Sequence, residues 1–129
     1  MIMLDTHILL WILSDRDQLS EKARNIIDRE KRCISIVSFW EISIKMSLKD
    51  PKRRLVLGIT LDELEKQCAK SEIDILPITT GDCKRASGLE HIHDDPFDRM
   101  IIAQAMERGI PLVTRDQRIW QYEDVEKIW

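Results

Sequence analysis

Several kinds of segment are missing from this 129-residue sequence, and each absence excludes a class of protein. No apolar run approaches the roughly 18 residues of a membrane-spanning helix, so we expect no membrane partner. With only 4 glycines and 4 prolines and no low-complexity tract, the chain shows no linker or disordered tail. Its first residues have no basic segment and no small-residue cleavage site, so they do not resemble a signal peptide.

Cysteine and net charge are also low. The 3 cysteines are Cys33, Cys68 and Cys83, an odd number without a CxxC pair, which argues against a disulfide framework and favours a reducing, cytoplasmic setting. The 20 Lys and Arg against 23 Asp and Glu give a formal charge of -3. This balance excludes tight, metal-free, non-specific binding to nucleic acid, but not a nucleic-acid enzyme with a small basic path. At about 150 residues per domain, we expect residues 1–129 to form one domain.

Short apolar runs alternate with helical stretches along the chain. Strands are predicted at 2–5, 33–37, 73–76 and 110–114, with an edge strand at 125–129, and helices at 6–13, 20–29, 38–50, 60–70, 80–89 and 96–108. The expected helix starts are Ser20, Ser38 with Glu41 in a capping box, Thr60, and Asp95 before a proline. Gly109 is the natural end of the last long helix. Such alternation predicts parallel βαβ units and an α/β/α sandwich with a central parallel sheet.

Four acids stand out by their place in these elements. Asp5 ends the first strand, Glu41 lies in the first turn of the predicted helix after the second strand, and Asp116 follows the fourth strand by two residues. Because strand carboxyl ends and the helix starts that follow them share one edge of a parallel sheet, topology alone brings these three together. Asp98 precedes its strand by a whole helix, so topology alone does not place it.

Each acid also has a purely structural explanation. Glu41 would complete the Ser38 capping box, Asp98 would stabilise a helix dipole, and Asp116 would cap the next turn. Asp5 is harder to explain in this way, because a carboxylate ending an apolar strand is partly buried and needs a partner. Asp98 shares a helix face with the apolar residues 101, 102 and 105, and a dipole acid has no need to point inward.

Clustered carboxylates repel one another unless a cation is present, and all-oxygen ligands favour Mg²⁺ or Mn²⁺. Asp5 and Asp98 are the primary candidate ligands, with Glu41 and Asp116 binding directly, through water, or orienting the nucleophile. His7, His91 and His93 look too scattered in sequence to offer a zinc site. A hard metal held by carboxylates suits phosphodiester hydrolysis.

The same residues resemble the PIN-domain ribonucleases, specifically the VapC-type toxins of bacterial type II toxin–antitoxin systems. The matching segments are MLDTH at 3–7, VSFWEISIK at 37–45, HDDPFDRMIIAQA at 93–105 and LVTRD at 112–116. The resemblance implies a PIN-like α/β/α fold, Mg²⁺- or Mn²⁺-dependent cleavage of RNA, and an acidic site of Asp5, Glu41, Asp98 and Asp116. It further implies supporting hydroxyls at Thr6 and Thr114, a homodimer, and inhibition by a cognate antitoxin.

Basic residues near the acids have two interpretations. Lys45, Lys49 and Arg53 follow Glu41 along its helix and the next loop, where they fit an RNA backbone path or a solvated helix end. Arg99 and Arg115 each adjoin a site acid and would contact phosphate or balance charge. The four tryptophans fit core or interface positions better than base stacking, and the apolar helix at 8–13 is a candidate protein-contact surface.

Two other function classes are weaker. A non-catalytic PIN-like module that binds protein or RNA has no reason to keep four repelling carboxylates. A haloacid-dehalogenase-like phosphatase would need a second Asp two residues after Asp5, where this chain has His7.

Overall fold

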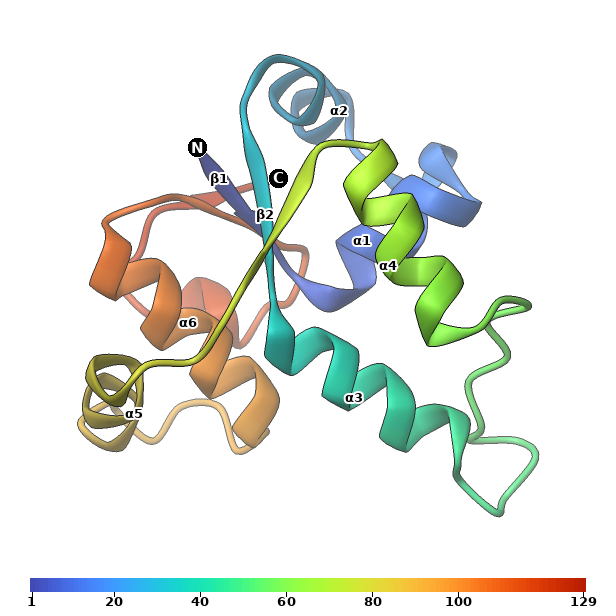
Figure 1. Cartoon of the computed structure of the whole chain (residues 1–129). Coiled ribbons are helices and arrows are strands. Elements are labelled where there is room, and N and C mark those ends of the chain that lie inside the picture. Colours follow the sequence, from blue (N-terminus) through green and yellow to red (C-terminus); the bar gives the residue numbers. More distant parts are fainter.

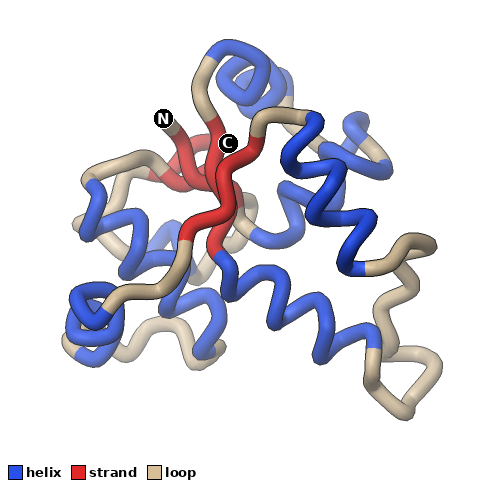
Figure 2. Tube along the Cα trace, in the orientation of Figure 1, coloured by secondary structure: helices blue, strands red, loops and turns tan.

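Five short parallel strands form one sheet in the order β3-β2-β1-β4-β5 in the computed structural model, which describes all 129 residues (Figures 1 and 2). The strands are β1 (Ile2–Leu4), β2 (Arg32–Ser35), β3 (Ile73–Leu76), β4 (Leu112–Val113) and β5 (Lys127–Ile128). Strands β2 and β3 lie on one side of β1, and the later strands β4 and β5 lie on its other side. The order therefore reverses at β1, and in such sheets ligands bind at the carboxyl ends beside the reversal.

The chain has six helices, of which α1, α2 and α4 lie on one side of the sheet and α5 and α6 on the other, while α3 continues from the end of β2 (Figure 1). Their bounds are α1 (Thr6–Ser14), α2 (Glu21–Arg29), α3 (Ile36–Met46), α4 (Leu61–Lys70), α5 (Thr80–Ser87) and α6 (Pro96–Arg108), with short 3-10 turns η1 (Arg16–Gln18) and η2 (Ile119–Gln121). This arrangement confirms the predicted α/β/α sandwich with a central parallel sheet. None of these helices has the length and apolar character that crossing a bilayer would take.

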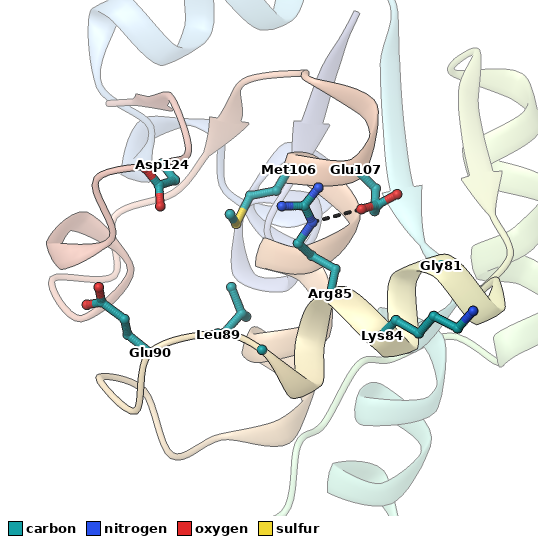
Figure 3. A pocket seen from close by; sticks show the side chains of 9 residues that line it. Gly81, Lys84, Arg85, Leu89, Glu90, Met106, Glu107 and Asp124 are labelled. Carbon is teal, nitrogen blue, oxygen red and sulfur yellow. Dashed lines mark hydrogen bonds and ion pairs between the residues drawn. The ribbon is translucent and has the colours of Figure 1, made fainter.

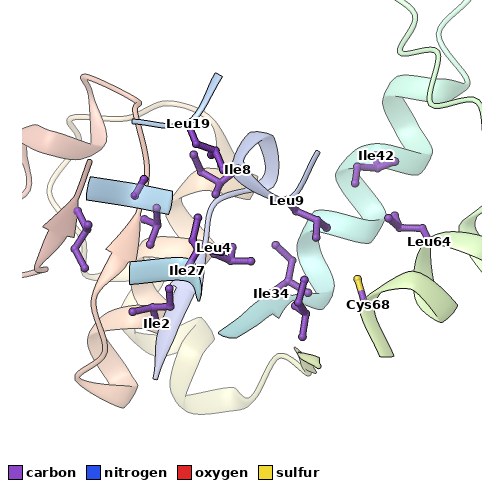
Figure 4. Close-up of a cluster of buried hydrophobic side chains, with 14 residues drawn as sticks. Ile2, Leu4, Ile8, Leu9, Leu19, Ile27, Ile34, Ile42, Leu64 and Cys68 are labelled. Carbon is purple, nitrogen blue, oxygen red and sulfur yellow. The ribbon is translucent and has the colours of Figure 1, made fainter. Parts of the chain in front are cut away.

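The alternation of side chains along the strands divides the core into two layers. In β1, Ile2 and Leu4 face the α1, α2 and α4 side, whereas Met3 faces α6, and all three are at most 2% exposed. Figure 4 shows the first layer, to which Ile27 of α2, Ile42 of α3 and Leu64 of α4 contribute together with the strand residues. Because both faces of the central strands are buried, β1 and β4 are wholly apolar, whereas the edge strand β3 carries the exposed Asp74.

Most predicted helix ends are confirmed. Ser20 and Thr60 cap α2 and α4 by accepting hydrogen bonds from the third backbone N–H of each helix, and Asp95 caps α6. Gly109 ends α6 with a φ of 60°, a left-handed conformation that costs a residue with a Cβ far more than it costs glycine. The last two strands are shorter than predicted, at two residues each.

The predicted junction at 33–38 is wrong. β2 ends at Ser35, and α3 begins at Ile36 with Ser35 rather than Ser38 as its N-cap. Ile36 and Val37 are β-branched and favour a strand by local preference, but Val37 packs under the sheet as part of the helix. Ser38 is fully buried and its hydroxyl oxygen lies 2.8 Å from Thr6 Oγ1. Glu41 is therefore not part of a capping box, and α3 ends at Met46 rather than continuing toward Pro51.

Candidate active site

The four predicted acids line one cavity of about 270 Å³ at the carboxyl edge of the sheet. Asp5 follows β1, and Asp116 follows β4 beside it. Asp98 reaches the same edge because α6 runs back to the start of β4, which puts the N-terminal turn of α6 at the strands' carboxyl ends. Thr6 and Lys45 line the same cavity. Residues far apart in sequence thus converge where the sheet order reverses.

Asp5 is buried, at 2% exposed, and every partner it has is a donor. Its Oδ1 accepts the backbone N–H of Thr6 at 2.8 Å, as the N-cap of α1. Its Oδ2 accepts the hydroxyl of Thr114 at 2.6 Å, and His7 Nδ1 lies 3.3 Å away. Burial raises the pKa of Asp5, against the lowering effects of His7 and of these hydrogen bonds. The carboxylate is held in one orientation and is costly to ionise without a cation.

Glu41 is 4% exposed and lies opposite Asp5, bridged by Thr6. The Thr6 hydroxyl is 2.7 Å from Glu41 Oε1, and Lys45 Nζ is 2.5 Å from Oε2. Burial acts to lower the pKa of Lys45, but its bond to Glu41 outweighs this and raises it. The Thr6 hydroxyl is thus hydrogen-bonded to Glu41 and the Thr114 hydroxyl to Asp5.

Asp98 differs from the other acids because it has almost no donors. Its single polar partner is the imidazole of His93, whose Nε2 lies 3.1 Å from Oδ2. Burial, followed by the nearby carboxylates of Asp5, Asp95, Glu41 and Asp116, raises the pKa of Asp98 to about 8. Asp98 is therefore the position where the site most lacks positive charge.

Asp116 is better compensated. Its Oδ1 accepts the backbone N–H of Arg118 at 2.8 Å, and its Oδ2 lies 2.9 Å from His93 Nε2. Burial acts to raise the pKa of Asp116, but the His93 and Arg118 contacts hold it below the usual value. Its backbone N–H donates to the Thr114 hydroxyl at 3.0 Å, so Thr114 links Asp116 to Asp5.

Two histidines contact the acids, which the sequence spacing failed to predict. His93 is 6% exposed and forms a group with Asp98 and Asp116 whose candidate ligand atoms all lie within 4.8 Å. His7 contacts Asp5, while His91 is exposed and has no such contact. The expectation that the scattered histidines offer no zinc site stays a prediction, but the sequence did not indicate that His93 lies beside Asp98 and Asp116. The available signal was its place two residues before Asp95 in the HDDPFD segment.

The basic residues occupy different positions. Lys45 lines the cavity, whereas Lys49, Arg53 and Arg115 are exposed and do not line it. Arg99 points elsewhere: its guanidinium donates to the backbone carbonyls of residues 86, 89, 90 and 93 at 2.9–3.4 Å. Because these bonds use the donors that would bind phosphate, they assign Arg99 to holding the loop between α5 and α6.

A larger hollow of about 620 Å³ lies away from the acids, over α5, the end of α6 and the segment before β5 (Figure 3). Its cationic side chains are Lys84 and Arg85, and Arg85 is paired with Glu107 at 2.7 Å. Glu90 and Asp124 line the other side. The charged side chains of this hollow do not converge on one point as the four acids do. We therefore do not assign the functional site to it, although its volume is larger.

Exposed apolar side chains gather on α3. Ile36, Trp40 and Ile44 are spaced by four residues and are 40%, 61% and 39% exposed, and Trp40 packs edge-on against Phe97. Trp11 instead packs on Trp129 with ring centroids 5.9 Å apart, next to half-buried residues of α1. The positions of these tryptophans agree with core and surface-contact roles.

Comparisons with known proteins agree with this geometry. The family model described as PIN domain matches residues 2–125. Ribonuclease VapC22 of Mycobacterium tuberculosis is 28% identical over 120 residues, which cover 92% of this chain and 88% of that protein.

Solved structures share the fold at lower identity. A DNA-bound VapBC from Salmonella typhimurium has a TM-score of 0.67 at 20% identity, covering 98% of this chain and 97% of that one. FitAcB from Neisseria gonorrhoeae has a TM-score of 0.67 at 21% identity, with 98% and 96% covered. A toxin–antitoxin complex from Klebsiella pneumoniae has a TM-score of 0.62 at 19% identity, with 97% and 95% covered.

Proposed function

Because the chain belongs to the PIN domain family, we propose that it is a metal-dependent endoribonuclease and the toxin of a type II toxin–antitoxin pair. The ribonuclease relative, which aligns along 92% of the chain, supports the reaction class. The observation that carries the proposal is the arrangement of carboxylate oxygens in the cavity. Seven of the eight oxygens of the four acids have a hydrogen-bond or ion-pair partner within the chain, and Asp98 Oδ1 has none.

The donor set fits a hard divalent cation. The cavity presents carboxylate and hydroxyl oxygens, and its least compensated acid, Asp98, has a pKa raised to about 8 by burial and by the acids around it. A cation there would favour the ionised form and relieve the repulsion. We propose Mg²⁺ or Mn²⁺, which prefer oxygen ligands and keep several waters. When bound, such a metal activates a water and polarises the phosphoryl oxygen.

The residues of the chain then have separate roles. Asp98 and Asp5 would hold the metal, and Glu41 and Asp116 would bind it directly or through water, or orient the nucleophile. The hydroxyls of Thr6 and Thr114 keep the carboxylates of Glu41 and Asp5 in place, since each donates at 2.7 Å or less. Lys45 Nζ, already charged beside Glu41, is placed to bind a phosphate of the RNA. The exposed Lys49, Arg53 and Arg115 would extend this basic path.

Nuclease assays on purified variants test the site. We expect Asp98→Asn and Asp5→Asn each to abolish Mn²⁺-dependent cleavage of RNA while the circular dichroism spectrum stays that of the wild type. Asp94→Asn is the matched control, because Asp94 lies in the same segment but its side chain is 92% exposed. Wild-type cleavage by Asp98→Asn would refute the assignment. Failure of the wild type to bind millimolar Mn²⁺ in calorimetry would favour a non-catalytic binding module.

The proposed partners follow from the same family. The structural neighbour from Klebsiella pneumoniae is a toxin–antitoxin complex, and we propose that this chain likewise binds a cognate antitoxin and forms a homodimer. The exposed Ile36, Trp40 and Ile44 of α3 offer an apolar surface for such contacts, and the half-buried apolar residues of α1 offer another. Co-expression with the product of the adjacent reading frame, followed by light scattering, tests both partners. A monomer that co-purifies with nothing would contradict this part of the proposal.

A further inference from the structure

We propose that His93 is a positioning residue: its Nε2–H holds one oxygen each of Asp98 and Asp116, which leaves Asp98 Oδ1 free for the metal, and His93 is not itself a ligand. This inference rests on the proposed metal-dependent function and adds a residue to its site. It starts from an unusual contact, in which a single ring nitrogen lies 3.1 Å from Asp98 Oδ2 and 2.9 Å from Asp116 Oδ2.

The hydrogen-bond network determines which nitrogen of His93 carries the proton. The backbone N–H of Asp95 donates to Nδ1 at 3.1 Å, so Nδ1 is an acceptor. A neutral imidazole with an accepting Nδ1 carries its hydrogen on Nε2. That N–H points at the two carboxylates and serves as a donor shared between them. If Nε2 were a metal ligand, the hydrogen of the ring would have to lie on Nδ1. The Nδ1–H and the backbone N–H of Asp95 would then face each other as two donors with no acceptor between them.

The ring is fixed by contacts that do not involve the acids. The backbone N–H of His93 donates to the Tyr122 hydroxyl at 3.0 Å, and that hydroxyl donates to the Glu90 carbonyl at 2.9 Å. Arg99 binds the His93 carbonyl and that of Glu90. These contacts attach the loop to α6 and to the segment after η2. They hold the His93 ring at the cavity as a fixed hydrogen-bond donor.

A fixed donor at this point has a specific consequence for metal binding. The candidate ligand atoms of His93, Asp98 and Asp116 lie within 4.8 Å of one another, so the two carboxylates would repel without a group between them. Because Asp116 uses its second oxygen to accept from Arg118, Asp98 is the acid of this pair whose second oxygen remains free. Outer hydrogen-bond partners of this kind orient metal ligands, and their loss typically costs 10–100-fold in affinity.

Two substitutions separate the two nitrogens of the ring. His93→Asn keeps a side-chain acceptor for the N–H two residues on, as Asn does in turns, but it is too short to reach the acids. His93→Gln places an amide N–H near the position of Nε2. The readouts are Mn²⁺ affinity by calorimetry, thermal melting as a check of folding, and ¹⁵N NMR of the metal-free wild-type imidazoles.

We expect His93→Asn to weaken Mn²⁺ binding roughly 10-fold or more, and His93→Gln to stay within about 3-fold of the wild type. NMR should show the hydrogen of the His93 ring on Nε2, and Mg²⁺ should leave it there.

The inference would be overturned by wild-type affinity in His93→Asn, by equal loss of affinity in both variants, or by displacement of the Nε2 hydrogen by Mg²⁺. If His93→Asn does not fold, His93→Gln and the NMR result decide. These outcomes leave the proposed function standing, whereas a wild type that binds no Mn²⁺ overturns both.

Discussion

Asp98→Asn is expected to stabilise the metal-free protein, although it removes a residue of the proposed active site. Asp98 has one polar partner and lies among four other acids, which together with burial raise its pKa from 3.8 to about 8. Asparagine has the shape of the protonated acid but never ionises. The substitution therefore removes the cost of keeping this group protonated in the folded chain at pH values where it would ionise in water.

The sign and size of the effect follow from linkage. The folded chain holds the Asp98 proton up to about pH 8, whereas the unfolded chain releases it near the ordinary pKa of 3.8. Between these values the folded state binds more protons, so wild-type stability falls as pH rises. The fall is about 1.4 kcal/mol per pH unit from this group, or about 3 kcal/mol between pH 5 and pH 7. Since the side chain is only 14% exposed, solvent screening reduces this little.

Urea unfolding in EDTA at pH 5, 6 and 7 measures the difference between the two proteins. Comparing wild type with Asp98→Asn cancels the other titrating groups, and Asp94→Asn, on a 92% exposed side chain, should show no such pH-dependent gap. Saturating Mn²⁺ should reverse the order, because the metal stabilises only the chain that can ligate it. A stability gap that is the same at pH 5 and pH 7, or a destabilised Asp98→Asn, would refute the reasoning.

Three further substitutions test the supporting structure by urea unfolding. Tyr122→Phe removes the buried hydroxyl that accepts from the His93 backbone and should lower the free energy of unfolding by about 1–3 kcal/mol. Thr114→Val should cost a similar amount, about 1–3 kcal/mol, because it removes the donor to Asp5 at 2.6 Å. Asp82→Asn breaks the ion pair with Arg108 and should cost about 2–4 kcal/mol at neutral pH. Because that ion pair and the Thr79 N–H lower the pKa of Asp82 despite its burial, this last difference should shrink as pH falls below 3.8. Losses below about 0.5 kcal/mol in any of the three would contradict the assigned contacts.

The fold was largely predictable because its signals are local or follow from chain order. The caps at Ser20, Thr60 and Asp95 and the end at Gly109 each depend on a few neighbouring residues. The junction between β2 and α3 was not predictable in this way. The β-branched Ile36 and Val37 favour a strand, and only the burial of Val37 against the far side of the sheet makes them the first turn of a helix.

The site was predictable in part. Topology places Asp5, Glu41 and Asp116 at one edge, and the resemblance adds Asp98. The role of Arg99 could not be predicted from the sequence, because an arginine next to a site acid could equally contact phosphate or hold a loop. Its four carbonyl partners come from segments that only the folded chain brings together. His93 was overlooked for a related reason, since its ring meets Asp116 from 23 positions away in the chain.

The strand and helix order, the parallel sheet and the shared edge of three acids were predictable from the sequence, because they depend on periodicity, capping and the order of elements along the chain. How the acids are compensated depends on contacts between distant segments and follows only from the folded structure. Which oxygen accepts from Thr114, Thr6, Lys45 or His93 depends on loops fixed by contacts between distant segments. The physical reason is that the number of acids already implies that they repel one another. The relief of this repulsion depends instead on where single donors lie, within about 3 Å of each carboxylate oxygen.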